Sequence, residues 1–206
     1  SSMGCKVSAE TKPRYTETVK IEDSAEWAGA PIVIELQGVG VSVNGGVKIE
    51  TFTNAGQKVA AEARTLAMST SDHKSDADLS LAEVKASFAI TREGGTIFVR
   101  CGHGQSHGDS NSGESGCELV TLALPAGTAD KPLNLHVTNG NGDMTIQAFN
   151  ATITEILANN KGDINAEVPA TKGGQVRLIG SQSDDVTVTV STDFAADHVQ
   201  VVGVAD

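Results

Sequence analysis

The sequence predicts an all-β protein, and three of its features lead to this fold class. Glycine, threonine, valine, serine, asparagine and aspartate dominate the composition, which is typical of short strands joined by tight turns. Several segments alternate polar and apolar residues, as half-buried strands do. Gly-Asp turns recur before such segments in the second half of the chain. Together these features favour a right-handed parallel β-helix, or solenoid, with an antiparallel N-terminal portion; a two-sheet β-sandwich is the alternative.

The chain has 206 residues, of which 39% are hydrophobic, enough for the core of one domain. We interpret residues 1–14 as a tag remnant followed by a polar tether, and residues 15–206 as a single β-solenoid domain. Within this domain, residues 101–117 form a loop insertion bounded by two cysteines.

The first strands follow from local alternation. Residues 15–21 predict a half-buried strand, and the apolar residues 31–36 predict a more buried one. The turn signal at 44–46, Asn-Gly-Gly, precedes an alternating strand expected at 47–52.

The middle of the chain is more ambiguous. Residues 58–68 fit a helical face, but their neighbours are all strands, so a strand is favoured there. We expect a polar loop at 69–78 and one or two turns of helix at 78–83. A Glu-Gly-Gly turn signal then joins strands expected at 84–91 and 96–100.

The C-terminal half repeats a Gly-Asp turn followed by an alternating strand. Gly142 and Gly162 open two such units about 20 residues apart, and a looser third unit follows. Asp143, Asp163 and Asp185 therefore recur in register. An acidic ladder able to take calcium is one explanation, but the preference for Asp in turns explains the pattern by itself.

The chain has three cysteines. Cys101 and Cys117 enclose a polar loop, so a disulfide between them predicts an oxidising compartment, with stabilisation of about 3 kcal/mol for a loop of about 15 residues. The remaining Cys5, behind Gly4 and before a polar segment, resembles the first residue of a mature bacterial lipoprotein, which is acylated. An ordinary surface cysteine is the alternative.

Charge and composition exclude several partners. The formal net charge is −11, with 26 acidic and 15 basic residues, and no block of Lys and Arg could neutralise a phosphate backbone. Aromatic residues make up only 3%, so stacking platforms for bases are missing as well. No run approaches the roughly 20 apolar residues of a membrane span, so a membrane is expected only through a lipid anchor.

A family resemblance rests on the arrangement of four sequence segments. These are "AEVKASFAITREGGTIFVRC" at 82–101, "LVTLALPAG" at 119–127, and the repeats "NGNGDMTIQAF" and "NNKGDINAEV". Together they resemble a bacterial adhesin-type domain of unknown function that is related to the GIN-type β-helical head domains. The resemblance implies a secreted or membrane-tethered domain with no established catalytic residues.

The loop at 101–117 departs from this family pattern, and it contains a hydrolase-like motif. Residues 104–108 match G-x-S-x-G, with Ser106 as the nucleophile and His198 as a distant partner. This motif requires a helix directly after it, but the Gly- and Ser-rich residues that follow are poor helix formers. We therefore expect no catalytic residue there.

The same loop offers metal ligands. Cys101 and Glu114 bound a segment that also holds His103, His107 and Asp109, a mixture that would suit zinc or copper. Oxidation of the cysteines would remove the thiolate ligands and leave only the weak candidates His103, His107 and Asp109. We therefore expect no metal and no cofactor.

The sequence thus predicts a non-enzymatic bacterial cell-envelope lipoprotein, anchored through Cys5 in the periplasm or at the cell surface. Its expected role is structural or adhesin-like, with an unknown envelope or surface protein or polymer as its partner and no nucleic acid. The alternative is a metal-binding or hydrolytic protein that uses the loop at 101–117.

Overall fold

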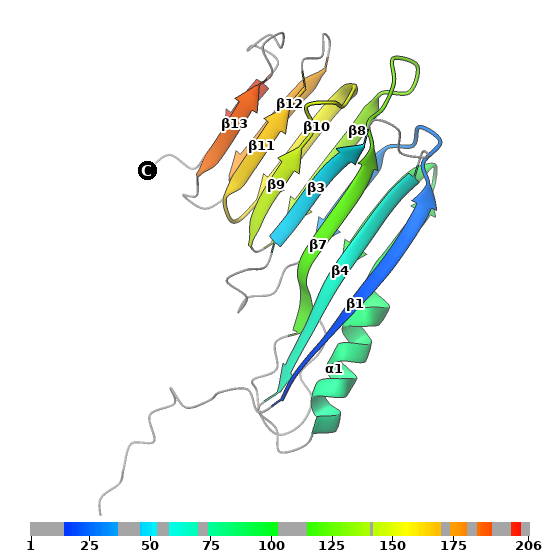
Figure 1. Cartoon of the computed structure of the whole chain (residues 1–206), viewed down its shortest axis with the longest axis vertical. Helices are drawn as coiled ribbons and strands as arrows, with labels where there is room; N and C mark the ends of the chain where they lie inside the picture. The colour runs from blue at the N-terminus through cyan, green and yellow to red at the C-terminus, as the bar shows by residue number, and fades with distance from the viewer. Residues whose placement is uncertain are drawn as a thin grey trace, which may run out of the picture.

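The computed structural model consists of two facing seven-stranded sheets and, in the described part of the chain, one helix (Figure 1). The described residues are 15–36, 46–52, 58–69, 74–102, 115–140, 142–169, 174–180, 185–190 and 199–202. Sheet A contains, in spatial order, β1 (Tyr15–Glu26), β4 (Lys58–Ser69), β7 (Ser115–Pro125), β3 (Gly46–Phe52), β9 (Asp143–Gln147), β11 (Ile164–Val168) and β13 (Val186–Val190). Sheet B contains β14 (Val199–Val202), β12 (Gln175–Gly180), β10 (Ile153–Asn160), β8 (Leu133–Asn139), β2 (Ile32–Leu36), β6 (Thr96–Cys101) and β5 (Ala89–Glu93).

Most neighbouring strands are parallel. In sheet A the parallel series runs from β7 to β13, and in sheet B it runs from β6 to β14. The antiparallel strands β1 and β4 extend sheet A at one end, and the antiparallel strand β5 extends sheet B at the same end. From β6 onward, consecutive strands alternate between the two sheets, so each turn carries the chain across the core.

The expected right-handed parallel β-helix is wrong, because the strands form two open, mixed sheets rather than a closed solenoid. The chain does not advance rung by rung over its whole length: from β8 to β14 each new strand lies beside the previous strand of its sheet, but β2 lies between β6 and β8, and β3 lies between β7 and β9. The two-sheet β-sandwich alternative agrees with this arrangement. The Gly-Asp turns mark where the chain passes from one sheet to the other. They do not determine that β2 and β3, from the first half of the chain, insert into the parallel series.

The core lies between the sheets because apolar side chains alternate along each strand. In β2, for example, Ile32, Ile34 and Leu36 point inward and are buried. Trp27 is fully buried at the start of this region, and its indole Nε1 donates a hydrogen bond to the carbonyl oxygen of Ala30 over 2.7 Å. Each fully buried aliphatic side chain contributes about 1.5–3 kcal/mol to stability.

Helix α1 (Lys74–Ser87) packs against β4, β1 and β7, beside the part of sheet A that Figure 1 shows extending beyond sheet B. Its buried residues Ala77, Leu81 and Val84 follow helical spacing and cover this part of the sheet. The helix is longer than expected, because it includes the end of the predicted loop at 69–78 and the start of the predicted strand at 84–91. The ambiguous segment at 58–68 is a strand, β4, as predicted.

The expected tether at 1–14, with Cys5, lies outside the described residues. No helix in the described part of the chain has the length and apolar character needed to cross a membrane.

Candidate functional site

The predicted disulfide between Cys101 and Cys117 is confirmed, and it joins the two sheets. Cys101 ends β6 in sheet B, and Cys117 lies near the start of β7 in sheet A, with 6.2 Å between their Cα atoms. The two residues are only 2% and 5% exposed. The bond therefore clamps both ends of the loop to the rigid sandwich.

A cavity of about 480 Å³ lies beside this clamp. It is lined by Glu35, Leu36, Ser87, Arg100, Cys101, Gly102 and Thr138. These residues come from the C-terminal ends of β2, β6, β8 and α1 and from the residue after β6. Parallel strands place their C-terminal ends at one edge of a sheet, so residues distant in sequence meet at the base of the loop.

Arg100 carries the positive charge at this cavity. Its Nε atom donates to Glu35 over 2.9 Å, and its Nη1 atom donates to Glu93 over 2.9 Å. Its guanidinium carbon also lies 4.1 Å from the centre of the Phe98 ring. The hydrogen bonds to Glu35 and then to Glu93 raise the pKa of Arg100 above its ordinary value, so this side chain stays charged.

Ser87 fixes the first residue after β6 to the end of α1. Its hydroxyl donates to the carbonyl oxygen of Val84 over 2.7 Å and accepts from the backbone N–H of Gly102 over 3.0 Å. The hydroxyl also lies 3.9 Å from the Sγ atom of Cys101. The hydrogen bond to Val84 fixes the hydroxyl at the end of α1, and the one from Gly102 fixes the first residue after β6. Ser87 therefore positions the start of the loop.

The ligand and nucleophile candidates within the loop, namely His103, Ser106, His107, Asp109 and Glu114, lie outside the described residues. Of the predicted site, the structure therefore describes only the disulfide at its base. Within the described ranges, no three His, Cys, Asp or Glu side chains are grouped so that they could hold a metal ion.

Sequence reasoning missed Glu35, Ser87 and Arg100. Arg100 and Glu35 are 65 residues apart, and only the pairing of β2 with β6 brings them together. The one local signal was the position of Arg100 directly before Cys101.

The repeated aspartates form a ladder through turn hydrogen bonds. The Oδ1 atom of Asp143 accepts from the backbone N–H of Asp163 over 3.2 Å, and the Oδ1 atom of Asp163 accepts from that of Asp185 over 3.0 Å. Each carboxylate thus links one turn to the next, which agrees with the explanation from turn chemistry.

A second hollow, of about 530 Å³, lies on sheet A and is lined by residues of β1, β4 and β7. The small side chains of Ala60 and Ala123 leave space there, and Glu22 and Glu62 are paired directly across two strands. Lys20 lies 3.4 Å from Glu22 and 3.9 Å from Glu62. These charged groups are exposed, so their attraction is weak in water.

Comparisons with protein families, with curated proteins and with solved structures found no match for this chain. The resemblance to an adhesin-type domain therefore stays a prediction.

Proposed function

We propose that this protein is a non-enzymatic domain of the bacterial cell envelope, tethered by a lipid on Cys5, that binds an envelope component through the loop at 101–117. The observation that carries this proposal is the disulfide between Cys101 and Cys117. Structural disulfides form in oxidising compartments and are rare in the cytoplasm.

The surroundings of the disulfide support a binding role for the loop. The disulfide between the sheets holds both ends of the loop. The hydroxyl of Ser87 also holds the first end, through the N–H of Gly102. Binding residues are commonly carried on loops that a rigid scaffold positions, and holding the ends lowers the entropy lost on binding.

The tether is tested on protein extracted from membranes of the source cells. Mass spectrometry should detect acyl chains on Cys5, and a Cys5→Ser variant should leave the membrane fraction. Unmodified Cys5 in protein recovered from the cytoplasm would contradict the proposal.

The binding role is tested with a loop replacement. Residues 103–114 are exchanged for a Gly/Ser segment of equal length, which keeps Cys101 and Cys117, and binding to isolated cell-wall polymer and to outer-membrane vesicles is measured. We expect the parent protein to bind one of these preparations and the replacement to lose most of that binding. A matched control replaces Asp130 and Lys131, which lie in the exposed β7–β8 connection, and should bind like the parent.

A second candidate function is a metal or hydrolytic site in the same loop. The cavity at the loop base favours it, because Glu35 and Arg100 provide opposite charges next to the segment that carries His103 and His107. Zinc titration of the oxidised protein distinguishes the candidates. Stoichiometric zinc that His103→Ala and His107→Ala abolish, or ester hydrolysis that Ser106→Ala abolishes, would replace the binding proposal.

A further inference from the structure

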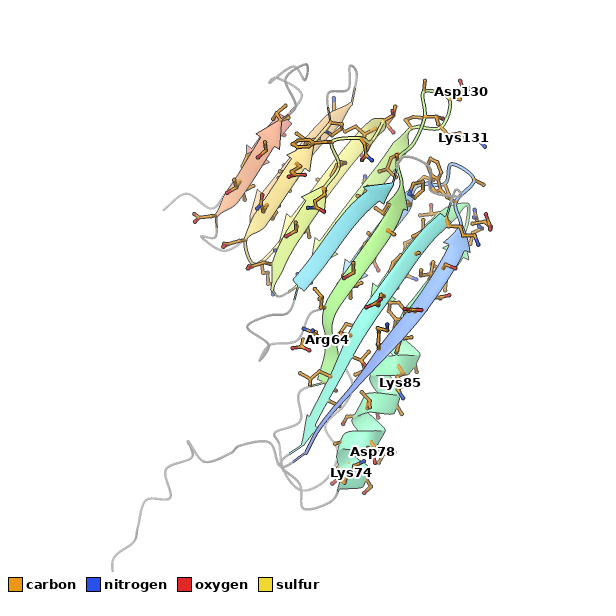
Figure 2. The ribbon with its side chains drawn as sticks, in the orientation of Figure 1. Arg64, Lys74, Asp78, Lys85, Asp130 and Lys131 are labelled. Atoms are coloured by element: carbon orange, nitrogen blue, oxygen red, sulfur yellow. A yellow bond between two sulfur atoms is a disulfide. The ribbon has the colours of Figure 1, made fainter. Side chains whose placement is uncertain are left out.

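The two ends of the sandwich differ in how their edge strands are protected. At one end, β1 presents Lys20, Glu22 and Glu26, and β5 contributes Arg92 and Glu93. Helix α1 packs near the same end and carries further charges, as Figure 2 shows for Lys74, Asp78 and Lys85. Charged side chains and a covering helix are the usual means of preventing a sheet edge from pairing with another chain.

At the other end, the last described strand of sheet A is β13, which Figure 1 shows at the outer edge of that sheet, and the last described strand of sheet B is β14. The strand β13 reads Val-Thr-Val-Thr-Val, and β14 reads Val-Gln-Val-Val. Neither strand contains a charged residue, a proline or a glycine. This end therefore lacks, within its two described edge strands, the sequence features that discourage pairing.

The core is also incompletely covered at this end. Along β11 the inward residues Ile164, Ala166 and Val168 are at most 1% exposed. Their register partners in β13, which are Val186, Val188 and Val190, are only partly buried. On sheet B, Leu178 is fully buried, whereas its register partner Val201 in β14 is 47% exposed.

Alternate backbone N–H and C=O groups of β13 point away from β11, its neighbour among the described strands. The backbone carbonyl oxygen of Asp185 accepts from the N–H of Ile164 over 3.0 Å. The backbone N–H and C=O groups of the odd-numbered residues of β13 therefore face β11. In a parallel ladder only alternate residues bond to one neighbour. The N–H and C=O groups of Val186, Val188 and Val190 therefore point away from β11, toward the edge.

We propose that this end is a self-association surface that takes a second copy of the same chain. A two-fold axis normal to the sheets would pair β13 with β13 and β14 with β14, antiparallel, and would extend both sheets through the interface. Val188 would lie opposite Val188 of the second copy. The proposal concerns a surface distinct from the loop at 101–117 and does not depend on its function.

The two edge strands carry no charge that would keep a second copy away. With a net charge of −11, two copies repel each other over most of their surface, but the strands β13 and β14 add no charge to that repulsion. An identical edge offers the same valine row and the same outward-facing backbone groups.

The size of the surface predicts weak association. Five residues span about 17 Å, and two sheets with their outer side chains are roughly 20 Å thick, so each copy would contribute about 350 Å². The total of about 700 Å² is below the roughly 1,200 Å² of stable interfaces. We therefore expect a dimer that forms reversibly as the protein concentration rises from micromolar toward millimolar.

Sedimentation equilibrium over that concentration range tests the proposal. The chain carries Cys5→Ser throughout, so that no disulfide through Cys5 can imitate association. Val188→Pro removes an edge N–H at a position where proline is tolerated, and Val188→Lys places a charge at the edge. Each should weaken dimerisation about tenfold or more.

Two controls separate edge pairing from other effects. Val188→Ala shortens the side chain but keeps the edge N–H, so it should retain more association than Val188→Pro. Thr91→Lys alters β5 at the opposite end and should dimerise like the parent. A parent that is monomeric throughout, or a dimer that neither Val188→Pro nor Val188→Lys weakens, would overturn the proposal.

Hydrogen exchange gives a second measurement that needs no variant. In the parent, the edge amides of β13 should exchange more slowly at high than at low protein concentration. If Val188→Pro and Val188→Lys fail to fold, equal exchange at both concentrations would overturn the proposal.

Discussion

The side-chain amide of Asn139 donates a hydrogen bond to the Oδ1 atom of Asn160 over 2.9 Å, where β8 and its parallel neighbour β10 end. The Nδ2 atom of Asn160 then donates to the carbonyl oxygens of Gly142, over 3.0 Å, and Asp163, over 2.9 Å. Asn139 is 3% exposed and Asn160 is fully buried. These two side chains therefore fix two successive reversals from sheet B to sheet A.

We predict that Asn160→Ala lowers the free energy of unfolding by about 2–4 kcal/mol, because it leaves buried polar groups without the partners that Asn160 supplies. Urea unfolding followed by the fluorescence of the buried Trp27 measures this change. Asn165→Ala, on an exposed position of the neighbouring strand β11, is the control and should cost less than about 0.5 kcal/mol. Equal effects of the two substitutions would contradict this role of Asn160.

Gly162 is required by the close stacking of two turns. A Cβ atom on Gly162 would overlap the carbonyl oxygen of Gly142 and lie 2.8 Å from its carbonyl carbon. Because both obstacles are backbone atoms, we predict that Gly162→Ala lowers the free energy of unfolding by about 2–4 kcal/mol. Chemical denaturation of the variant and the parent gives the difference.

Gly94 provides the matched control for that substitution. It has a positive φ of 56°, but a Cβ atom there would meet nothing within 4 Å. Gly94→Ala should therefore cost only about 1–2 kcal/mol, the strain of a left-handed alanine. A loss for Gly162→Ala no larger than this would show that the turns can separate.

Reduction of the disulfide should destabilise the sandwich. For a sequence separation of 16 residues, the chain-entropy relation predicts a loss of about 3 kcal/mol when the bond between Cys101 and Cys117 is absent. Urea unfolding with and without reductant, and of a Cys101→Ala/Cys117→Ala double variant, measures it. Cys5→Ser should leave the unfolding midpoint unchanged, and a midpoint insensitive to reductant would contradict a structural role for the bond.

The sequence was informative where the fold depends on local chemistry. The neighbouring strands indicated a strand at 58–68, Gly-Asp turns identified the parallel units that begin at Gly142 and Gly162, and the flanking cysteines identified the disulfide. Each of these follows from turn preference or side-chain periodicity within a short window.

The sequence was misleading where the fold depends on distant pairing. The placement of β2 between β6 and β8 depends on contacts between residues far apart in the sequence, which a local repeat does not reveal. From the repeat alone, a solenoid was therefore expected. The cavity at the loop base could not be predicted for the same reason, since Glu35 and Arg100 meet only through this pairing. The helix began at Lys74 because packing against β4 stabilises a segment whose polar residues suggested a loop.

The function that we propose requires the bond between Cys101 and Cys117 to form in an oxidising compartment. Disulfide mapping of protein isolated from the source cells, with free thiols alkylated at harvest, tests it most directly. We predict one peptide pair that joins Cys101 to Cys117 and no alkylation at either residue. Alkylation of both cysteines, or a bond from either of them to Cys5, would contradict the account.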